Sequence, residues 1–134
     1  MQQNTKILRQ FKNQQLKYSK TSEIGENEDV LDLECGTGHL TRKIRSLTKG
    51  KVVGINPSEG MIKEAVGKSR GFDMVYEVKS AEDMDYEDSF DVIFCNSAFQ
   101  WFKDPEKAIK NCHRALRRKW KDRDLGACEE SVLP

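Results

Sequence analysis

Short apolar runs alternate along the chain with segments whose apolar residues recur every three or four positions. Each run has the length and the β-branched or aromatic content of a buried strand. Four runs of this kind span residues 30–33, 51–56, 73–79 and 90–96. The periodic segments predict helices at residues 4–20, 39–49, 59–67 and 105–116.

The alternation of strands and helices predicts an α/β fold with an open parallel sheet of about four strands and flanking helices. Ligands of such sheets bind at the carboxyl ends of the strands, where the strand order reverses. In this chain those ends carry residues 32–38, 56–57, 80–83 and 96–101.

Two of the predicted helices have clear start signals and buried faces. Ser58 and Asp104 are good N-cap residues, and Pro105 suits the first helical position. The residues expected to face the core are Met61, Ile62, Ala65 and Val66 in the first of these helices, and Ala108, Ile109, Cys112, Ala115 and Leu116 in the second.

Composition narrows the function classes. The chain has 134 residues and a net charge of +1, which argues against a general electrostatic grip on nucleic acid or on an anionic membrane. No apolar run approaches the ~20 residues that a membrane span needs, and the polar start lacks a signal peptide. We therefore expect a cytoplasmic protein. The four widely spaced cysteines and two histidines predict free thiols and no metal site.

The strongest local signal lies directly after the first predicted strand. Gly36 and Gly38 stand between that strand and the next helix, where glycine allows a tight turn and a close approach of the backbone to a ligand. The dinucleotide fingerprint G-x-G-x-x-G needs a third small residue, and Thr41 stands at that position. A nicotinamide-dependent oxidoreductase is thus a weak alternative.

The glycine turn belongs to the first of four blocks that follow one another along the chain, at residues 30–41, 52–62, 81–84 and 90–102. In these blocks the sequence resembles the class I, Rossmann-like, S-adenosylmethionine-dependent methyltransferases, and most closely their small-molecule branch. The resemblance covers roughly residues 25–118.

The resemblance implies a role for particular residues at the cofactor. The turn from Asp32 to Gly38, which includes Glu34 and Cys35, would hold the methionine part, with Gly36 and Gly38 against its backbone. The remaining implied cofactor contacts are Asn56 at the ribose, Pro57 and Met61 flanking the adenine, Ala81 and Glu82 at the adenine edge, and Asn96 near the methionine end.

Phe99 and Trp101 would face the methyl acceptor, which the resemblance implies is a small molecule. Methyl transfer is an in-line displacement in which positioning can supply most of the catalysis. A general base is needed only for some acceptors, and no residue is singled out here as a catalytic base.

Three features depart from the family pattern. Glu34 replaces the family's first glycine, and Asn56 replaces an acid that usually bonds the ribose hydroxyls. The family fold also continues with three further strands, whereas residues 119–134 predict an irregular basic tail. We expect an N-terminal helix in residues 1–24, a methyltransferase-like domain in 25–118, and an exposed edge on the fourth strand that attracts a protein partner or a second copy. The alternative function is therefore an inactive methyltransferase-like remnant that acts through a partner.

Overall fold

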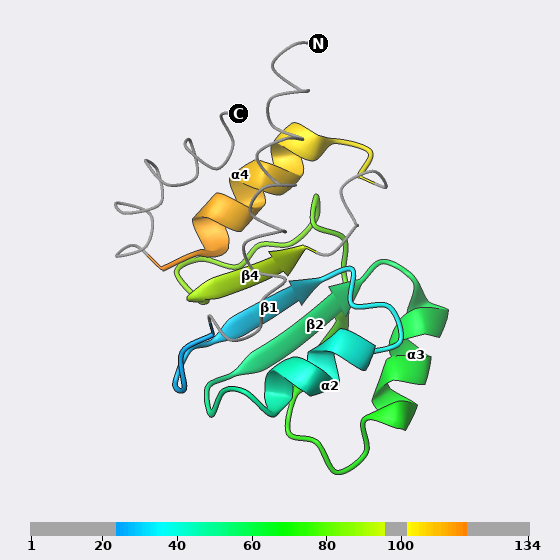
Figure 1. The fold of residues 1–134 in the computed structure, drawn as a ribbon. Coiled ribbons are helices and arrows are strands. Elements are labelled where there is room, and N and C mark those ends of the chain that lie inside the picture. Colours follow the sequence, from blue (N-terminus) through cyan, green and yellow to red (C-terminus); the bar gives the residue numbers. More distant parts are fainter. Residues whose placement is uncertain (1–23, 96–101, 118–134) are drawn as a thin grey trace.

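The computed structural model describes residues 24–95 and 102–117. Four parallel strands form one sheet in the order β3-β2-β1-β4 (Figure 1). They are β1 (Val30–Leu33), β2 (Val52–Asn56), β3 (Val75–Val78) and β4 (Val92–Cys95). The described helices are α2 (His39–Arg45), α3 (Glu59–Lys68) and α4 (Pro105–Ala115). The predicted α/β fold with a parallel sheet is confirmed, while the helix expected at 4–20 and the tail at 119–134 lie outside the described residues.

Helices cover both faces of the sheet. Figure 1 shows α4 on one face and α2 on the other, with α3 beside β2 and β3. Side chains alternate accordingly along β1, because successive residues of a strand point to opposite faces. Leu31 and Leu33 belong to the apolar cluster that contains Ala108 and Cys112 of α4. Val30 belongs to the cluster on the α2 side.

The predicted caps of two helices are confirmed. The Ser58 hydroxyl accepts a hydrogen bond from the Met61 N–H at 3.3 Å, and the Asp104 carboxylate accepts one from the Lys107 N–H at 3.2 Å. Pro105 occupies the first turn of α4, where its missing N–H costs no helical hydrogen bond.

The prediction of which α3 residues are buried is partly wrong. Ile62 and Ala65 are buried, but Met61 and Val66 are exposed by 45% and 52%. The strand that α3 partly covers is β3, which lies at the edge of the described sheet and is only four residues long. A narrow stripe of α3 is therefore enough to cover the apolar surface beneath it.

Helix α2 ends at Arg45, earlier than predicted. The Arg45 guanidinium donates to the backbone carbonyls of Asp73 at 2.6 Å, Thr48 at 2.7 Å and Gly50 at 2.5 Å. These bonds hold the chain after Arg45 in a turn, so Leu47 is left partly exposed instead of extending the helical face.

Helix α4 also ends before its predicted last residue. Leu116 has an extended backbone and forms a parallel bridge with Phe90. The Arg117 N–H donates to the Phe90 carbonyl at 2.9 Å, and the Phe90 N–H donates to the Ala115 carbonyl at 3.1 Å. Phe90 therefore precedes the regular part of β4 and binds the chain that leaves α4.

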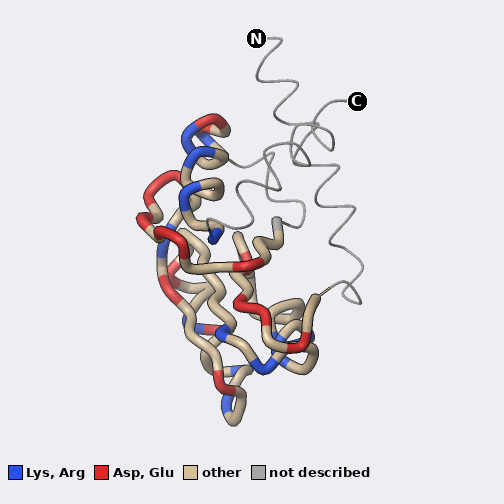
Figure 2. Tube along the Cα trace, turned by 90° about the vertical axis from the view of Figure 1, so that its left-hand side faces the viewer, with Lys and Arg blue, Asp and Glu red and all other residues tan. Residues whose placement is uncertain are grey.

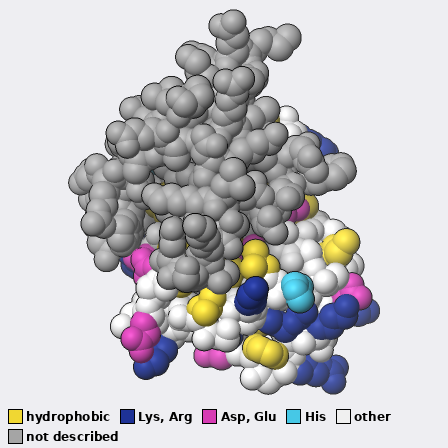
Figure 3. All heavy atoms as spheres, viewed as in Figure 1, with side chains coloured by type: hydrophobic (Ala, Val, Ile, Leu, Met, Phe, Trp, Pro, Cys, Tyr) yellow, Lys and Arg dark blue, Asp and Glu magenta, His cyan; other side chains and the backbone are white. Residues whose placement is uncertain are grey.

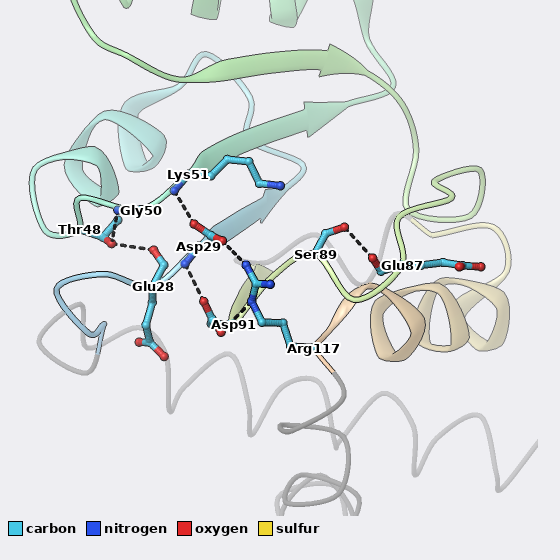
Figure 4. A network of polar contacts seen from close by, with 9 residues as sticks. All are labelled: Glu28, Asp29, Thr48, Gly50, Lys51, Glu87, Ser89, Asp91 and Arg117. Atoms are coloured by element: carbon cyan, nitrogen blue, oxygen red, sulfur yellow. Dashed lines mark hydrogen bonds and ion pairs between the residues drawn. The ribbon is translucent and has the colours of Figure 1, made fainter.

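A cluster of polar contacts around Asp29, Asp91 and Arg117 joins the amino ends of the strands (Figure 4). Arg117 bonds the carboxylate of Asp29 and, at 3.1 Å, that of Asp91. The Asp91 carboxylate also accepts from the Asp29 N–H at 2.8 Å, and Asp29 accepts from the Lys51 N–H at 2.6 Å. One arginine thus links the segment after α4 to the starts of β1 and β4.

Charge is distributed unevenly over the surface. Acidic residues recur along the connection between β3 and β4 (Figure 2). Lysine and arginine side chains gather over α2 and its surroundings in the space-filling view (Figure 3), and α2 contributes Arg42, Lys43 and Arg45. None of the helices in the described ranges has the length and hydropathy needed to span a bilayer.

Candidate functional site

The carboxyl ends of β1, β2 and β4 lie along the same edge of the sheet (Figure 1). The strand order reverses between β1 and β4, because β2 and β3 follow on one side of β1 and β4 pairs on the other. This is the place at which open parallel sheets bind ligands. The turn that follows β1 therefore stands at the edge predicted to carry the site.

Three residues of that turn have a left-handed backbone. Their φ angles are 53° at Glu34, 58° at Gly36 and 87° at Gly38. The Cys35 N–H donates to the Ile55 carbonyl at 2.9 Å, and the Gly38 N–H donates to the Cys35 carbonyl at 3.0 Å. The turn is thus tied to the end of β2, and Glu34 holds a conformation that normally favours glycine.

The two glycines of the turn have different surroundings. Among the residues that the structure describes, none would lie within 4 Å of a Cβ atom at Gly36. A Cβ atom at Gly38 would lie 2.5 Å from the Tyr76 hydroxyl and 2.9 Å from the Arg42 guanidinium. Gly38 is required by packing within the protein. Gly36 leaves open space against its backbone, as a ligand held by this turn would need.

Tyr76 packs against the turn and supports it. This role was not predicted from the sequence. Its ring lies so close to Gly54 on β2 that a Cβ atom there would be 2.9 Å from it. Its hydroxyl lies 2.8 Å from the Ser69 hydroxyl, to which Arg42 also donates at 3.2 Å. A glycine in the middle of a buried strand signals such a close approach, so Gly54 was the available clue.

Asp32 is a buried carboxyl group on β1. It accepts a hydrogen bond from the Thr41 hydroxyl at 2.7 Å, which joins β1 to α2. Burial raises the pKa of Asp32 to about 7, and the Thr41 bond offsets only part of that effect. Asp32 therefore lies beneath the turn as a structural group shared by β1 and α2.

Cys35 is buried within the turn. Burial, and next the charge of Asp32, raise the pKa of its thiol to about 12. The thiol is consequently protonated at neutral pH and is a poor nucleophile. Cys95 lies on β4 in register with Leu33, whereas Cys35 lies after the end of β1, so Cys35 and Cys95 are not register partners.

Glu34 and Glu82 bring two carboxylates near each other at this edge. The pKa of Glu34 is raised, first by partial burial and then by the charge of Glu82. The Glu82 carboxylate accepts from the N–H groups of Lys103 at 2.7 Å and Asp104 at 3.3 Å, just before α4. Glu82 is thereby held in place by the start of α4.

The residues that follow β2 fall into two groups. Asn56 is buried, and its side-chain oxygen accepts from the Ser58 N–H at 2.8 Å. Pro57 and Met61 are exposed at the same end of the strand, where a planar ligand group could contact them. The oxygen of Asn56 is thus already engaged within the protein.

Ala81 and Glu82 are positioned by a side chain of α4. The buried Asn111 amide donates to their backbone carbonyls at 2.9 Å and 2.8 Å. Ala81 is part of the core on the α4 side of the sheet. Asn111 is a second supporting residue that the apolar pattern of the helix did not reveal. The predicted site residues Asn96, Phe99 and Trp101 lie outside the described residues.

A family model described as a methyltransferase domain matches residues 31–119. The chain belongs to this methyltransferase family. The match begins within β1 and includes the glycine turn and every later element of the described fold, so the resemblance seen in the sequence is confirmed. The methyltransferase fold also explains why the open turn lies at the point where the strand order reverses.

Named relatives and solved structures agree with that assignment. Malonyl-[acyl-carrier protein] O-methyltransferase of Bacillus anthracis is 31% identical over 101 residues, which are 75% of this chain and 36% of that protein. The YcgJ protein of Bacillus subtilis is 27% identical with a TM-score of 0.68, over 78% of this chain and 46% of that one.

An S-adenosylmethionine-dependent methyltransferase of Mesorhizobium loti is 25% identical with a TM-score of 0.64. That match covers 69% of this chain and 43% of the other protein. The chain spans about a third of the length of the curated relatives it matches, and a little under half of these solved structures.

Proposed function

We propose that this methyltransferase domain binds S-adenosylmethionine at the carboxyl ends of β1 and β2 and transfers its methyl group to a small-molecule acceptor. The observation that carries the proposal is the open space at Gly36, inside a turn that the family match includes. The domain would comprise residues 25–118, as the sequence predicted.

In this proposal the turn from Glu34 to Gly38 holds the methionine part of the donor, with Gly36 against it. Asp32 and Tyr76 support this part of the site without contacting the ligand. Asp32 bonds Thr41 of α2, and Tyr76 bonds Ser69 at the end of α3. When bound, S-adenosylmethionine supplies an activated methyl group on a sulfonium centre.

The nucleoside would lie across the ends of β2 and the loop after β3. Pro57 and Met61 are exposed there and would flank the adenine, with Ala81 and Glu82 at its edge. Asn56 would face the ribose through its amide nitrogen, because its oxygen is bonded to Ser58. A neutral amide bonds more weakly than the usual carboxylate, by roughly a factor of two per bond.

The names of the curated relatives support one class of methyl acceptor. Relatives named malonyl-[acyl-carrier protein] O-methyltransferase support an acceptor molecule that has a carboxyl group. That molecule is either free or attached to a carrier protein. A carboxylate needs no general base to accept a methyl group. In the proposed complex, Phe99 and Trp101 face the methyl acceptor, and Asn96 faces the methionine end of the donor.

The first test is calorimetric titration of the purified chain with S-adenosylhomocysteine, the reaction product. We expect binding with a Kd in the micromolar range, and no comparable binding of NADH. A chain that unfolds cooperatively but binds no S-adenosylhomocysteine at millimolar concentration would contradict the proposal.

A matched pair of variants locates the binding site. Gly36→Ala places a methyl group in the open space of the turn, and we expect it to weaken binding about tenfold or more. Gly71→Ala is the control, because Gly71 also has a positive φ and open surroundings but lies between α3 and β3. Equal loss of binding in both variants would indicate general destabilisation instead of a contact at Gly36.

We further propose a cytoplasmic location, on the grounds of composition. We also propose that a protein partner or a second copy of the chain binds at the edge of β4. On the side of β4 away from β1, the described residues add only the bridge between Phe90 and Leu116. Sedimentation of the purified chain over a range of concentrations tests self-association at this edge, and we expect the sedimentation coefficient to rise with concentration.

A further inference from the structure

Glu34 places a charged side chain in the turn that leads from β1 to α2. Its φ of 53° is that of a glycine position, and the next residue, Cys35, is tied to β2 through its bond to Ile55. Glu34 is half-buried. It is therefore held at the point where β1 ends between β2 and β4, two positions before the open backbone at Gly36.

Glu82 supplies a second fixed negative charge. Its carboxylate is anchored by two N–H groups before α4, and it is near enough for its charge to act on Glu34. Within the described ranges, no lysine or arginine forms a salt bridge with either carboxylate. A cationic ligand group is the natural complement to such a pair, because partly buried like charges repel each other.

We propose that Glu34 is a specificity-determining residue that, with Glu82, makes the site prefer the cationic sulfonium donor to its neutral thioether product. The inference rests on the proposed function. S-adenosylmethionine has a positive sulfonium, a positive amino group and a negative carboxylate, whereas S-adenosylhomocysteine lacks the sulfonium charge. A negative side chain beside the methionine part distinguishes the two ligands by that charge.

The consequence is a bias toward exchange of product for donor after each transfer. A glycine at position 34 has no side chain and makes no such distinction. The charge of Glu34 acts on the carboxylate and amino group of both ligands in the same way, so these groups cancel in a comparison of the two Kd values. The ratio of the Kd of S-adenosylhomocysteine to that of S-adenosylmethionine therefore isolates the sulfonium charge.

The experiment measures both Kd values by calorimetry for the unmodified chain and for Glu34→Gln, which keeps the size of the side chain and removes its charge. We expect the ratio to fall about five- to tenfold in Glu34→Gln, the size of one screened charge pair at a partly solvated site. Glu82→Gln should lower it in the same direction and serves as the second variant if Glu34→Gln does not fold.

Glu87→Gln is the matched control. It removes one negative charge from an exposed residue in the loop before β4 (Figure 4), next to Asp88, whose N–H bonds the Arg114 carbonyl near the end of α4. This change should leave the ratio unchanged. A ratio in Glu34→Gln within twofold of the unmodified chain would overturn the inference, as would an equal fall in Glu87→Gln. If the unmodified, folded chain binds neither ligand, the proposed function itself fails and the inference with it.

Discussion

At the scale of single residues, Glu34 imposes a backbone cost. A residue with a Cβ atom in the left-handed region costs roughly 1–2 kcal/mol relative to glycine. We expect Glu34→Gly to raise the free energy of unfolding by about 1 kcal/mol, measured by urea denaturation. Glu34→Ala is the control, since it removes the charge but keeps the Cβ atom. An equal gain in Glu34→Ala would assign the cost to repulsion from Glu82 instead of to φ.

Asp32 makes stability depend on pH. Its pKa is about 7 in the folded chain against an ordinary value of 3.8, so the folded state binds the proton more tightly. The stability that Asp32 contributes is fully present below about pH 4 and is lost as the pH rises through 7, by at most ~1.4 kcal/mol per pH unit. Between pH 5 and pH 8, urea unfolding should show a smaller decrease for Asp32→Asn than for the unmodified chain. Parallel curves would exclude this role.

The surroundings of single residues at the site could not be predicted from the sequence. Gly36 and Gly38 were equivalent in the sequence, yet only Gly36 leaves open space, because Tyr76 and Arg42 reach Gly38 from β3 and α2. Glu34 was recognised as a departure from the family pattern, but its repulsive neighbour Glu82 comes from a loop 48 positions away (82 minus 34). Such contacts depend on tertiary structure, and no local pattern encodes them.

At the scale of elements, the aromatic ring of Tyr76 on β3 packs closely against Gly54 on β2. Gly54→Ala would bring a Cβ atom to 2.9 Å from the Tyr76 ring and 3.1 Å from the Cys35 Cβ atom. We expect it to lower the free energy of unfolding by about 1–3 kcal/mol.

A double-mutant cycle with Tyr76→Val, which removes the ring, checks the cause of that loss. The cost of Gly54→Ala should be smaller in the Tyr76→Val background, because one of the two close neighbours is gone. Additive costs in the cycle would show that Cys35, and not Tyr76, sets the limit at Gly54.

Element positions followed well from the sequence where local signals were strong. The starts of α3 and α4 were predicted from Ser58 and Asp104, since N-caps act within one turn. The ends were predicted less well. α2 stops at Arg45 because its side chain bonds carbonyls as far away as Asp73, and α4 stops because Phe90 draws Leu116 into an extended pairing.

At the scale of the whole molecule, Arg117 connects parts of the chain that are far apart in sequence. Its bonds to Asp29 and Asp91 are partly buried. We expect Arg117→Met to lower the free energy of unfolding by about 1–3 kcal/mol, because two partly buried carboxylates lose their common partner. Chemical denaturation provides the measurement.

Lys49→Met is the comparison for that variant. Lys49 pairs with Glu26, and both side chains are at least 70% exposed. Exposed pairs contribute little, so the denaturation midpoint should barely move. If Arg117→Met were as mild as Lys49→Met, the cluster at the amino ends of the strands would contribute nothing beyond an ordinary surface pair.

The pairing of β1 with strands on both sides has a consequence for the order of folding. Asp29, just before β1, bonds the Lys51 N–H 22 positions later, the Asp91 carboxylate 62 positions later and Arg117 88 positions later. Closing a longer loop costs more chain entropy, so the β2 side of β1 has the smaller barrier. On the ribosome, β1 and β2 can meet long before β4 is synthesised. One edge of β1, which has neighbours on both sides in the described sheet, then stays unpaired until β4 is synthesised.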